Sequence, residues 1–453
     1  MKLVAVDMDG TFLDQEKNYN RTVFEKVYEY MKAHDILFVV ASGNQYFQLK
    51  SFFDDKDIIY VSENGGLIME NHQDVYHSII PFEDVKDIVN ILQKEKHVYI
   101  CLCGLKAAYL LDSTPEFYKH HLQYYHRIEM IHSLDEIHDE IVKFALWVPD
   151  YNNDEYSLIL QEKLKDYVQV ISSGNTSIDL IKPGIHKGHA IEWLCQKHHI
   201  SLQDCIAFGD GENDIEMLQM VGQGYAMENA KEIVKEHAYA ICPANNKNGV
   251  LRQLIEIFDI KLDELLKATL GMCYDANNDP KVLDEIHNAH HLCYKFNQLD
   301  PLNQEKKQEY LSKLFQQELD NVTIISPLFC DRGYNISLGK NVYINYNAYL
   351  MDGAKITIGD NVFIGPSAGF YTAIHPLDYK RRNQGIEKAK PITIGDNVWL
   401  GGNVVILPGV TIGSGSVIGA GSVVTKDIPE NVLAIGNPCK VIKPIDQNYD
   451  KSF

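Results

Sequence analysis

The most constraining feature of this sequence is a six-residue repeat in its C-terminal third. Small or apolar residues recur every six positions in two series, which begin at Ile336 and Ile356. They are Ile336, Val342 and Ala348, followed by Ile356, Val362, Ala368, Ile392, Val398, Val404, Val410, Ser416, Ser422 and Ile428. An α-helix repeats about every 3.6 residues and a strand about every 2. A sustained period of six therefore predicts a parallel β-helix, whose stacked turns share one core.

One long loop, from Ile374 to Pro391, interrupts this repeat. Ala368 and Ile392 are four whole repeats apart, so the register continues across the loop. The loop is therefore expected to project from an unbroken β-helix, which is where solenoid proteins often place function. His375 begins the loop, and histidine suits a general base that takes a proton from a hydroxyl group.

The N-terminal half alternates between apolar strands and amphipathic helices, as in a parallel sheet that is covered on both faces. Asp7 and Asp9 follow the strand LVAV, and Asp210 follows the strand CIAFG. Because parallel strands end at one edge of a sheet, these carboxylates are expected to meet. One carboxylate can attack a phosphoryl group, another can transfer protons, and Mg²⁺ can neutralise the charge.

Three further side chains fit this interpretation. Ser42, after the strand ILFVVA, can donate a hydrogen bond to a phosphate oxygen, and Lys187 can balance negative charge. Asp214 supplies another carboxylate close to Asp210. Each of these residues alone is more often structural than catalytic. Their order at successive predicted strand ends favours a catalytic site.

DMDGT, the strand end at Ser42, KGHA and GDGENDIEML resemble, in order, the four motifs of the haloacid dehalogenase superfamily. The resemblance implies a Rossmann-like α/β core at residues 1–81 and 184–258, with an α/β cap at 82–183 as in Cof-type sugar phosphatases. The roles that it implies are Asp7 as nucleophile, Asp9 as general acid and base, and Lys187 as a catalytic cation. Asp7, the Asp9 carbonyl and Asp210 would hold Mg²⁺ with Asp214 supporting the site, and Ser42 and Asn213 would lie at the phosphoryl group. Asn44 stands where the family often has arginine, which removes a phosphate contact.

The repeat region and the segment before it resemble the maltose and galactoside O-acetyltransferases, through FYTAIHPLDYKRRNQG, KPITIGDNVWLGGNVVILPGVTIGSGSVIGAGSVVTKDIP and GNPCKVIK. The resemblance implies a helical extension at 259–320, a left-handed β-helix at 321–453 and a homotrimer with active sites between subunits. It assigns His375 as general base, Asp331, Asn345 and Asp352 as acceptor contacts, and Trp399, Gly402, Ala420, Thr425 and Lys426 as acetyl-CoA contacts, with Lys440 and Lys443 near the coenzyme phosphates. Asp331, Asn345 and Asp352 are equally compatible with structural β-helix corners. The family's usual arginines are missing from the extension DEIHNAHHLCYKFN.

The composition excludes several other classes of protein. A formal net charge of −20 argues against nonspecific binding to nucleic acid or to an acidic membrane surface. No transmembrane segment or signal peptide is expected, and the nine scattered cysteines then indicate reduced thiols in the cytoplasm. The expected partners are a sugar or sugar phosphate and coenzyme A.

The sequence thus predicts a bifunctional enzyme. Its first half would hydrolyse a sugar phosphate through an aspartyl-phosphate with Mg²⁺, and its second half would transfer an acetyl group from acetyl-CoA to a sugar hydroxyl. We hypothesise that the first reaction yields the sugar that the second one acetylates. The alternatives are a phosphatase whose β-helix serves only as a trimerisation module, and a sensor that binds these ligands without turnover.

Overall fold

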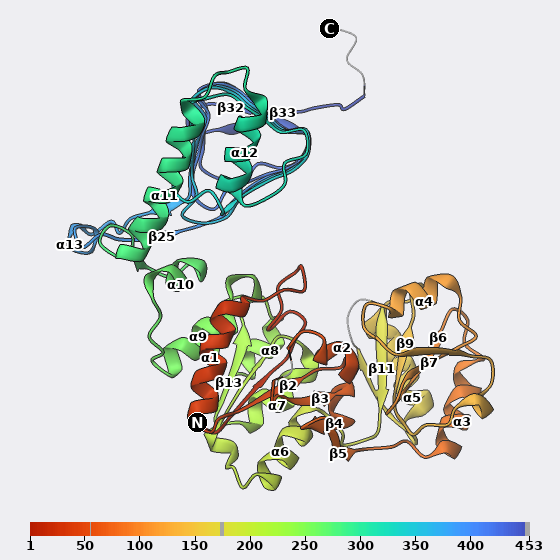
Figure 1. Ribbon diagram of the computed structural model, residues 1–453. Coiled ribbons are helices and arrows are strands. Elements are labelled where there is room, and N and C mark those ends of the chain that lie inside the picture. The colour runs from red at the N-terminus through yellow and green to blue at the C-terminus, as the bar shows by residue number, and fades with distance from the viewer. Residues whose placement is uncertain (55, 173–175, 449–453) are drawn as a thin grey trace. The chain divides into compact units, whose positions relative to one another are not determined.

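The computed structural model describes residues 1–54, 56–172 and 176–448, and the chain forms two compact units, Met1–Ile260 and Lys261–Phe453 (Figure 1). The last five residues of the range expected for the β-helix lie outside the described residues. None of the helices in the described ranges combines the length and hydropathy that crossing a bilayer requires.

The first unit contains an eight-stranded sheet with the order β14-β13-β12-β1-β2-β3-β4-β5. Its strands are β1 (Leu3–Val6), β2 (Leu37–Ala41), β3 (Ile59–Ser62), β4 (Leu67–Glu70), β5 (Gln73–His77), β12 (Cys205–Gly209), β13 (Gln223–Met227) and β14 (Ala240–Cys242). All pairs from β14 to β3 are parallel, and β4 and β5 are antiparallel additions. Parallel strands with both faces covered must be apolar throughout, which explains the uninterrupted LVAV and FVVA segments.

Helices cover both faces of this sheet (Figure 1). The helices of the core are α1 (Arg21–Ala33), α2 (Tyr46–Lys50), α6 (Lys187–Lys197), α7 (Ile215–Met220), α8 (Glu232–Glu236) and α9 (Gly249–Ile257). On one face Leu194 of α6 and Met217 of α7 join Leu3 in a buried cluster. On the other face the ring of Phe24 in α1 lies 5.3 Å from that of Phe38 in β2.

A second sheet, with the order β10-β11-β9-β6-β7-β8, is inserted after the first five strands. It consists of β6 (Tyr99–Gly104), β7 (Ala108–Leu111), β8 (Ile128–Ile131), β9 (Ile141–Trp147), β10 (Gln169–Ser172) and β11 (Ser177–Ile181). Helices α3 (Phe82–Leu92) and α5 (Asn153–Leu164) pack on one face, and Phe117 of α4 (Pro115–His121) packs on the other. The chain then returns to the first sheet at α6.

The second unit begins with the helices α10 (Glu264–Thr269), α11 (Pro280–Asn297) and α12 (Gln304–Phe315). Of these, α11 and α12 pack against the core of the β-helix. The side chain of Asp279 accepts a hydrogen bond from the Val282 N–H, and Pro280 occupies the first turn, so the start of α11 is encoded locally. Phe296 of α11 and Phe315 of α12 join the core of the β-helix.

The β-helix has three parallel sheets. The first contains β16 (Thr323–Ile324), β19 (Tyr343–Ile344), β22 (Phe363–Ile364), β27 (Trp399–Leu400), β30 (Val417–Ile418) and β32 (Val432–Ile435), with β33 (Lys440–Pro444) as an antiparallel edge; the second contains β17 (Leu328–Cys330), β20 (Ala348–Met351), β23 (Gly369–Tyr371), β28 (Val405–Ile406) and β31 (Val423–Val424); the third contains β18 (Ile336–Leu338), β21 (Ile356–Ile358), β26 (Ile392–Ile394) and β29 (Thr411–Ile412). Every repeat residue named from the sequence is buried, which confirms the period of six.

The long loop leaves this β-helix and returns to it in register. Ile356 in β21 pairs with Ile392 in β26, so consecutive turns stack across the excursion, as predicted. The excursion contains β24 (Ala373–Ile374), α13 (Tyr379–Arg382) and β25 (Ile386–Ala389). β25 also pairs with β15 (Tyr274–Asp275), so the loop and the helical segment form one small sheet.

Two leucines allow a matched test of this packing. Leu350 is 0% exposed in the β-helix core, whereas Leu377 is 97% exposed in the long loop. Leu350→Ala is expected to lower the free energy of unfolding by about 2–5 kcal/mol, because it leaves a cavity in a close-packed core. Leu377→Ala should change it by less than about 0.5 kcal/mol. Denaturant titration of both variants tests the assignment, and equal effects would contradict it.

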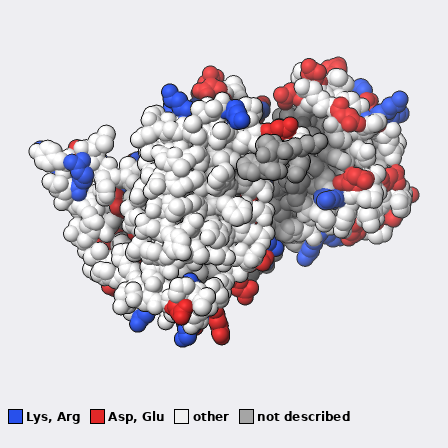
Figure 2. Space-filling model, turned by 90° about the horizontal axis from the view of Figure 1, so that it is seen from above, with Lys and Arg blue, Asp and Glu red and all other residues white. Residues whose placement is uncertain are grey.

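The outer side of the first β-helix sheet carries large exposed rings. Phe363 and Trp399 are paired neighbours on β22 and β27, and each is 56% exposed. Figure 2 shows a broad surface over the β-helix unit with few charged side chains. Exposed aromatic rings on a surface with few charges are typical of contacts between proteins.

Candidate active sites

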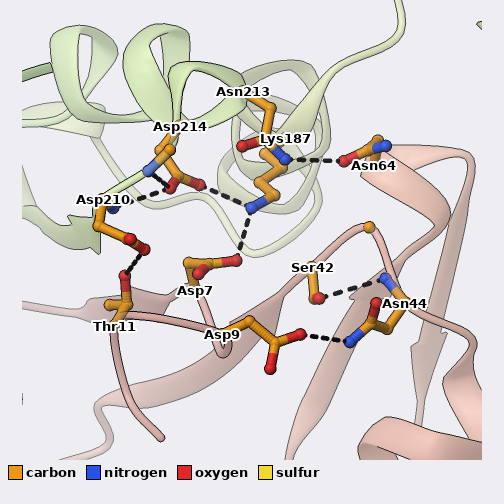
Figure 3. A network of polar contacts seen from close by, with 12 residues as sticks. Asp7, Asp9, Thr11, Ser42, Asn44, Asn64, Lys187, Asp210, Asn213 and Asp214 are labelled. Carbon is orange, nitrogen blue, oxygen red and sulfur yellow. Dashed lines mark hydrogen bonds and ion pairs between the residues drawn. The ribbon is translucent and has the colours of Figure 1, made fainter. Parts of the chain in front are cut away.

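The phosphatase candidates lie where parallel strands of the first sheet end. Of the predicted residues, Asp7 follows β1, Ser42 follows β2 and Asp210 follows β12, and Glu63, which the sequence did not identify, follows β3. The strands are neighbours in the order β12-β1-β2-β3, so their carboxyl ends place these side chains along one edge. Figure 3 shows the resulting cluster of polar groups.

Lys187 lies between two buried carboxylates. Its Nζ donates to Asp7 Oδ1 at 2.7 Å and to Asp214 Oδ1 at 2.6 Å. Burial raises the pKa of Asp7 well above its usual range, although Lys187 opposes this shift. Burial alone would lower the pKa of Lys187, but the Asp214 and Asp7 carboxylates raise it. The lysine therefore remains a cation beside the Asp7 oxygen atoms.

Asp210 completes an acidic cluster with Asp7 and Asp214. Each of the three residues offers an oxygen atom, and these atoms all lie within 4.8 Å of one another. Asp210 Oδ1 accepts a hydrogen bond of 2.7 Å from Thr11, and burial raises the pKa of Asp210 to about 6. Carboxylate oxygens are the ligands that Mg²⁺ prefers, so this donor set fits such an ion. Gly10 is required here, because a Cβ at its φ of +80° would clash with Asp210.

The Asp9 carboxylate was expected to meet those of Asp7 and Asp210, but this expectation is wrong, because its side chain is turned away from the cluster (Figure 3). Asp9 Oδ2 accepts a hydrogen bond of 2.8 Å from Asn44 Nδ2, and Asp9 Oδ1 contacts Lys17 Nζ. Ser42 Oγ accepts a hydrogen bond of 3.2 Å from the Asn44 N–H. Asn44 therefore forms a hydrogen bond with Asp9, the predicted general acid and base, in place of the phosphate contact that an arginine would make.

Asn213 takes part in a chain of side-chain hydrogen bonds that the sequence did not predict. Its Nδ2 donates to Asn64 Oδ1 at 3.0 Å, and Asn64 Nδ2 donates to Asp179 Oδ2 at 2.6 Å. Asp179 belongs to the inserted sheet, as does Lys143, whose Nζ lies 2.9 Å from Glu63 Oε2. Burial raises the pKa of Glu63 even with this cation beside it. A charged residue in each of two otherwise largely apolar strands, IVKFALW and SIDLI, is the sequence signal that could have revealed this network.

A cavity of about 750 Å³ opens over the catalytic cluster. Both sheets of the first unit contribute to its walls. The inserted segment supplies rings and polar groups, namely His120, His121, Tyr124, Tyr125, Lys143, Tyr151, Asn152, Asn153, Asp154, Ser172, Ser177 and Asp179. Such a mixture of rings and hydrogen-bonding groups suits a polar organic molecule that carries a phosphate.

In the second unit His375 is partly exposed at the start of the long loop. Its Nδ1 lies 3.3 Å from the Ile386 carbonyl oxygen, and its Nε2 lies 3.8 Å from Glu387 Oε2. An Nδ1–H that donates to this carbonyl would leave Nε2 free to accept a proton. The Tyr274 hydroxyl donates to Glu387 Oε1, and Arg332 Nη2 donates to the Tyr274 hydroxyl at 3.4 Å. The sequence did not identify Glu387, Tyr274 or Arg332, because only the fold brings them together.

The three predicted acceptor residues lie on neighbouring turns of the β-helix. Asp352 Oδ1 accepts hydrogen bonds of 2.9 and 2.8 Å from the Asp331 and Arg332 N–H groups, and burial raises the pKa of Asp352 to about 6. Asp331 Oδ1 accepts a hydrogen bond of 2.7 Å from the Tyr349 hydroxyl. Asn345 Oδ1 accepts one from the backbone of the next residue. Within the described part of the chain, no hydrogen bond or ion pair joins any of the three directly to His375.

The predicted coenzyme residues lie near or at the surface of the β-helix. Gly402 and Ala420 lie on successive turns, which are joined by a hydrogen bond of 2.9 Å from the N–H of residue 421 to the Gly402 carbonyl. Trp399 begins β27, and the exposed Thr425 and Lys426 follow β31. The two remaining lysines, Lys440 and Lys443, are exposed in β33.

Comparison with family models divides the chain in the same way. Residues 4–254 match the haloacid dehalogenase-like hydrolases. Residues 267–317 match the maltose acetyltransferase hexapeptide capping motif, and residues 391–426 match the bacterial transferase hexapeptide repeats.

Individual relatives agree with these matches. The first half is 41% identical over 254 residues to the Escherichia coli 5-amino-6-(5-phospho-D-ribitylamino)uracil phosphatase YbjI, covering 55% of this chain and 94% of that protein. The second half is 58% identical over 173 residues to a Staphylococcus aureus protein described as an acetyltransferase, SAR2635, covering 38% of this chain and 87% of the relative. The crystal structure of SMU.1108c from Streptococcus mutans superposes with a TM-score of 0.54 at 31% identity, covering 57% of this chain and 99% of that structure.

The fold and the first site thus define a phosphatase class, and the second unit defines a transferase class. The chain belongs to the haloacid dehalogenase-like hydrolase family, and its C-terminal unit is a hexapeptide-repeat acetyltransferase. It is a bifunctional enzyme with a phosphatase and an O-acetyltransferase in one polypeptide.

Proposed function

We propose that the first unit hydrolyses a sugar phosphate through an aspartyl-phosphate at Asp7. The observation that carries this proposal is the Lys187 cation, which lies within hydrogen-bond distance of the buried Asp7 and Asp214 carboxylates. Lys187 balances the charge on Asp7 and on the incoming phosphoryl group, so that an anionic nucleophile and an anionic substrate can approach each other.

The proposed reaction has two steps. A carboxylate oxygen of Asp7 bonds to phosphorus while the bond to the sugar oxygen breaks, and Asp9 gives its proton to that oxygen. Asp9 then takes a proton from water, which attacks phosphorus and releases Asp7 and inorganic phosphate. Ser42 and Asn213 would bind phosphoryl oxygens. Bound Mg²⁺, held by Asp7, Asp210, Asp214 and the Asp9 carbonyl, would neutralise negative charge at this site.

Phosphate release is expected to depend on Mg²⁺. EDTA should abolish phosphate release, Mg²⁺ should restore it, and acetyl transfer should be unaffected. Burial raises the pKa of Asp210 to about 6, so its ligating, ionised form predominates at pH 7.5 and declines as the pH falls toward 5.5. The Mg²⁺ concentration for half-maximal activity should therefore rise between these pH values. Full phosphate release in EDTA would contradict the metal assignment.

We further propose that the second unit transfers an acetyl group from acetyl-CoA to a sugar hydroxyl, with His375 as base. Nε2 of His375 would take the hydroxyl proton while the acceptor oxygen attacks the thioester carbonyl and coenzyme A leaves as the thiol. The Glu387 carboxylate, 3.8 Å from Nε2, favours the imidazolium that forms. Burial, and then Glu387, raises the pKa of Tyr274, which remains a protonated donor to that carboxylate.

The acetyltransferase is proposed to act as a homotrimer with left-handed β-helices. The exposed Phe363 and Trp399 rings and the weakly charged surface in Figure 2 support burial of this region against further copies of the chain. Within the described residues of one chain, no hydrogen bond or ion pair joins the acceptor or coenzyme residues to His375, as expected when neighbouring subunits complete each site. Light scattering should then give three chains per particle.

The two reactions are proposed to act on the same sugar, and the cap at residues 82–183 would select it. Incubation of the protein with a set of hexose and pentose phosphates, acetyl-CoA and Mg²⁺ should yield an acetylated sugar only where phosphate is released. Two activities without a shared sugar would refute the coupling and leave both enzymes intact. The contact between His375 and Glu387 favours a working transferase over a β-helix that only assembles subunits.

A further inference from the structure

Asn44 departs from the arginine that the first family often carries, and the structure gives this asparagine a contact of its own. Its side-chain Nδ2 donates to Asp9 Oδ2 at 2.8 Å, and its backbone N–H donates to Ser42 Oγ at 3.2 Å. The other oxygen of Asp9 contacts Lys17. Asp9 is thus held from two sides, by an uncharged donor and by a cation (Figure 3).

The loop that carries Asn44 is fixed by the inserted segment on both sides of this residue. Before it, the Gly43 carbonyl oxygen accepts a hydrogen bond of 2.6 Å from Lys143 Nζ. After it, the buried Gln45 side chain bonds to the backbone of His126 and Arg127. Gln45 Oε1 accepts from these two N–H groups at 2.9 and 3.0 Å, and Nε2 donates to the Arg127 carbonyl at 3.0 Å.

Lys143 is itself held firmly, because it is fully buried with Glu63 and Asp179. Its position is therefore set by charges on both sheets of the first unit. Movement of the inserted segment away from the core would break its bond to Gly43 and the three bonds to Gln45. The orientation of Asn44 thus depends on the same closed arrangement that covers the cavity.

We propose that Asn44 is a positioning residue for Asp9, and that Lys143 and Gln45 couple its orientation to closure of the inserted segment. The inference rests on the proposed phosphatase reaction, in which Asp9 protonates the leaving oxygen. Asn44 fixes Oδ2 of Asp9, so that the carboxyl group keeps one orientation, turned away from Asp7 and toward the side from which the leaving oxygen departs in an in-line attack. The loop that carries Asn44 then links enclosure of the substrate to proton transfer. Asn44 acts by orienting Asp9, not by binding the phosphate group.

The leaving group provides the test, because proton transfer matters only when the departing oxygen is basic. An alkyl oxygen, as in a sugar phosphate, must be protonated, whereas p-nitrophenolate leaves without help. Asn44→Ala should lower kcat/KM for the best sugar phosphate by about 10- to 100-fold, the range expected for a misplaced catalytic group. It should lower kcat/KM for p-nitrophenyl phosphate by less than about threefold.

A second variant keeps the shape of the side chain. Asn44→Asp removes the donor and places a carboxylate beside Asp9, so it should show at least the same selective loss and remains informative if the alanine variant misfolds. Gln45→Leu, which deletes the contacts to residues 126 and 127, should show the same selectivity with a smaller loss. Mg²⁺-dependent thermal stabilisation serves as a folding check for each variant.

Equal losses on both substrates, with a raised KM for each, would identify Asn44 as a phosphate ligand and overturn the positioning role. Unchanged rates on both substrates would overturn it as well. A wild-type protein that releases phosphate from neither substrate would instead refute the proposed phosphatase, and the positioning role with it. Selective loss on the alkyl substrate is the one outcome that supports the proposal.

Discussion

Replacement of Asp7 by asparagine is expected to reduce phosphate release by about 10⁴-fold or more, the scale observed when a covalent nucleophile is removed. The amide keeps the size of the side chain, but it is a poor nucleophile and carries no charge. The hydrogen bond from Lys187 to this position can still form, because the amide oxygen accepts it. The loss therefore reports on chemistry rather than on packing.

Initial rates of phosphate release with the best sugar phosphate are the measurement for Asp7→Asn. Acetyl transfer by the same preparation is the internal control, because Asp7 belongs to the other unit of the chain. Incubation of the wild type with substrate followed by rapid acid quenching should trap phosphate on the protein, and the variant should trap none. Residual activity within tenfold of wild type would exclude Asp7 as nucleophile.

Replacement of His375 by asparagine is expected to reduce acetyl transfer by about 10²- to 10⁴-fold, the usual contribution of a general base. The Ile386 carbonyl and the Glu387 carboxylate would face a side chain that cannot accept the hydroxyl proton. Release of coenzyme A thiol in the presence of a sugar acceptor measures the effect. Phosphate release should be unchanged, so the Asp7 and His375 variants are each other's controls.

The KM for acetyl-CoA gives a further check on the His375 variant. It should change little, because the imidazole is assigned to the acceptor hydroxyl rather than to the coenzyme. A variant that lost coenzyme binding together with rate would place His375 in the coenzyme site. Near wild-type turnover of the variant would show that His375 is not the general base.

The sequence predicts those parts of the fold that depend on local pattern. The repeat series that includes Ile356 and Ile392 specifies inward positions one turn at a time, and the structure confirms its burial on both sides of the long loop. Asp7 and Asp210 follow apolar strands, and parallel topology alone brings such strand ends to one edge. These predictions need no knowledge of which distant side chains touch.

Pairings between distant residues could not be predicted in this way. Glu387 is 113 positions from Tyr274, and the two meet only because β25 pairs with β15. In the sequence, nothing distinguishes Lys143 from other lysines in predicted strands. Only the fold shows that it is buried against Glu63. From the sequence, Asn44 indicated only that the family's usual arginine, and its phosphate contact, are absent. The sequence does not show that the asparagine forms a hydrogen bond with Asp9.

The strand order of the first sheet also constrains the order of events during synthesis. In the sheet, β1 lies between β2 and β12. In the sequence, roughly two hundred residues separate the start of β1 from the start of β12, so β12 is synthesised much later. The inserted sheet is complete in the nascent chain before β12 emerges, so it can fold while β1 still has one edge unpaired. Lys187 and Asp214 can contact Asp7 only after they have been synthesised. The nascent phosphatase should therefore remain inactive, with one edge of β1 accessible to chaperones, until residues beyond Asp214 leave the exit tunnel.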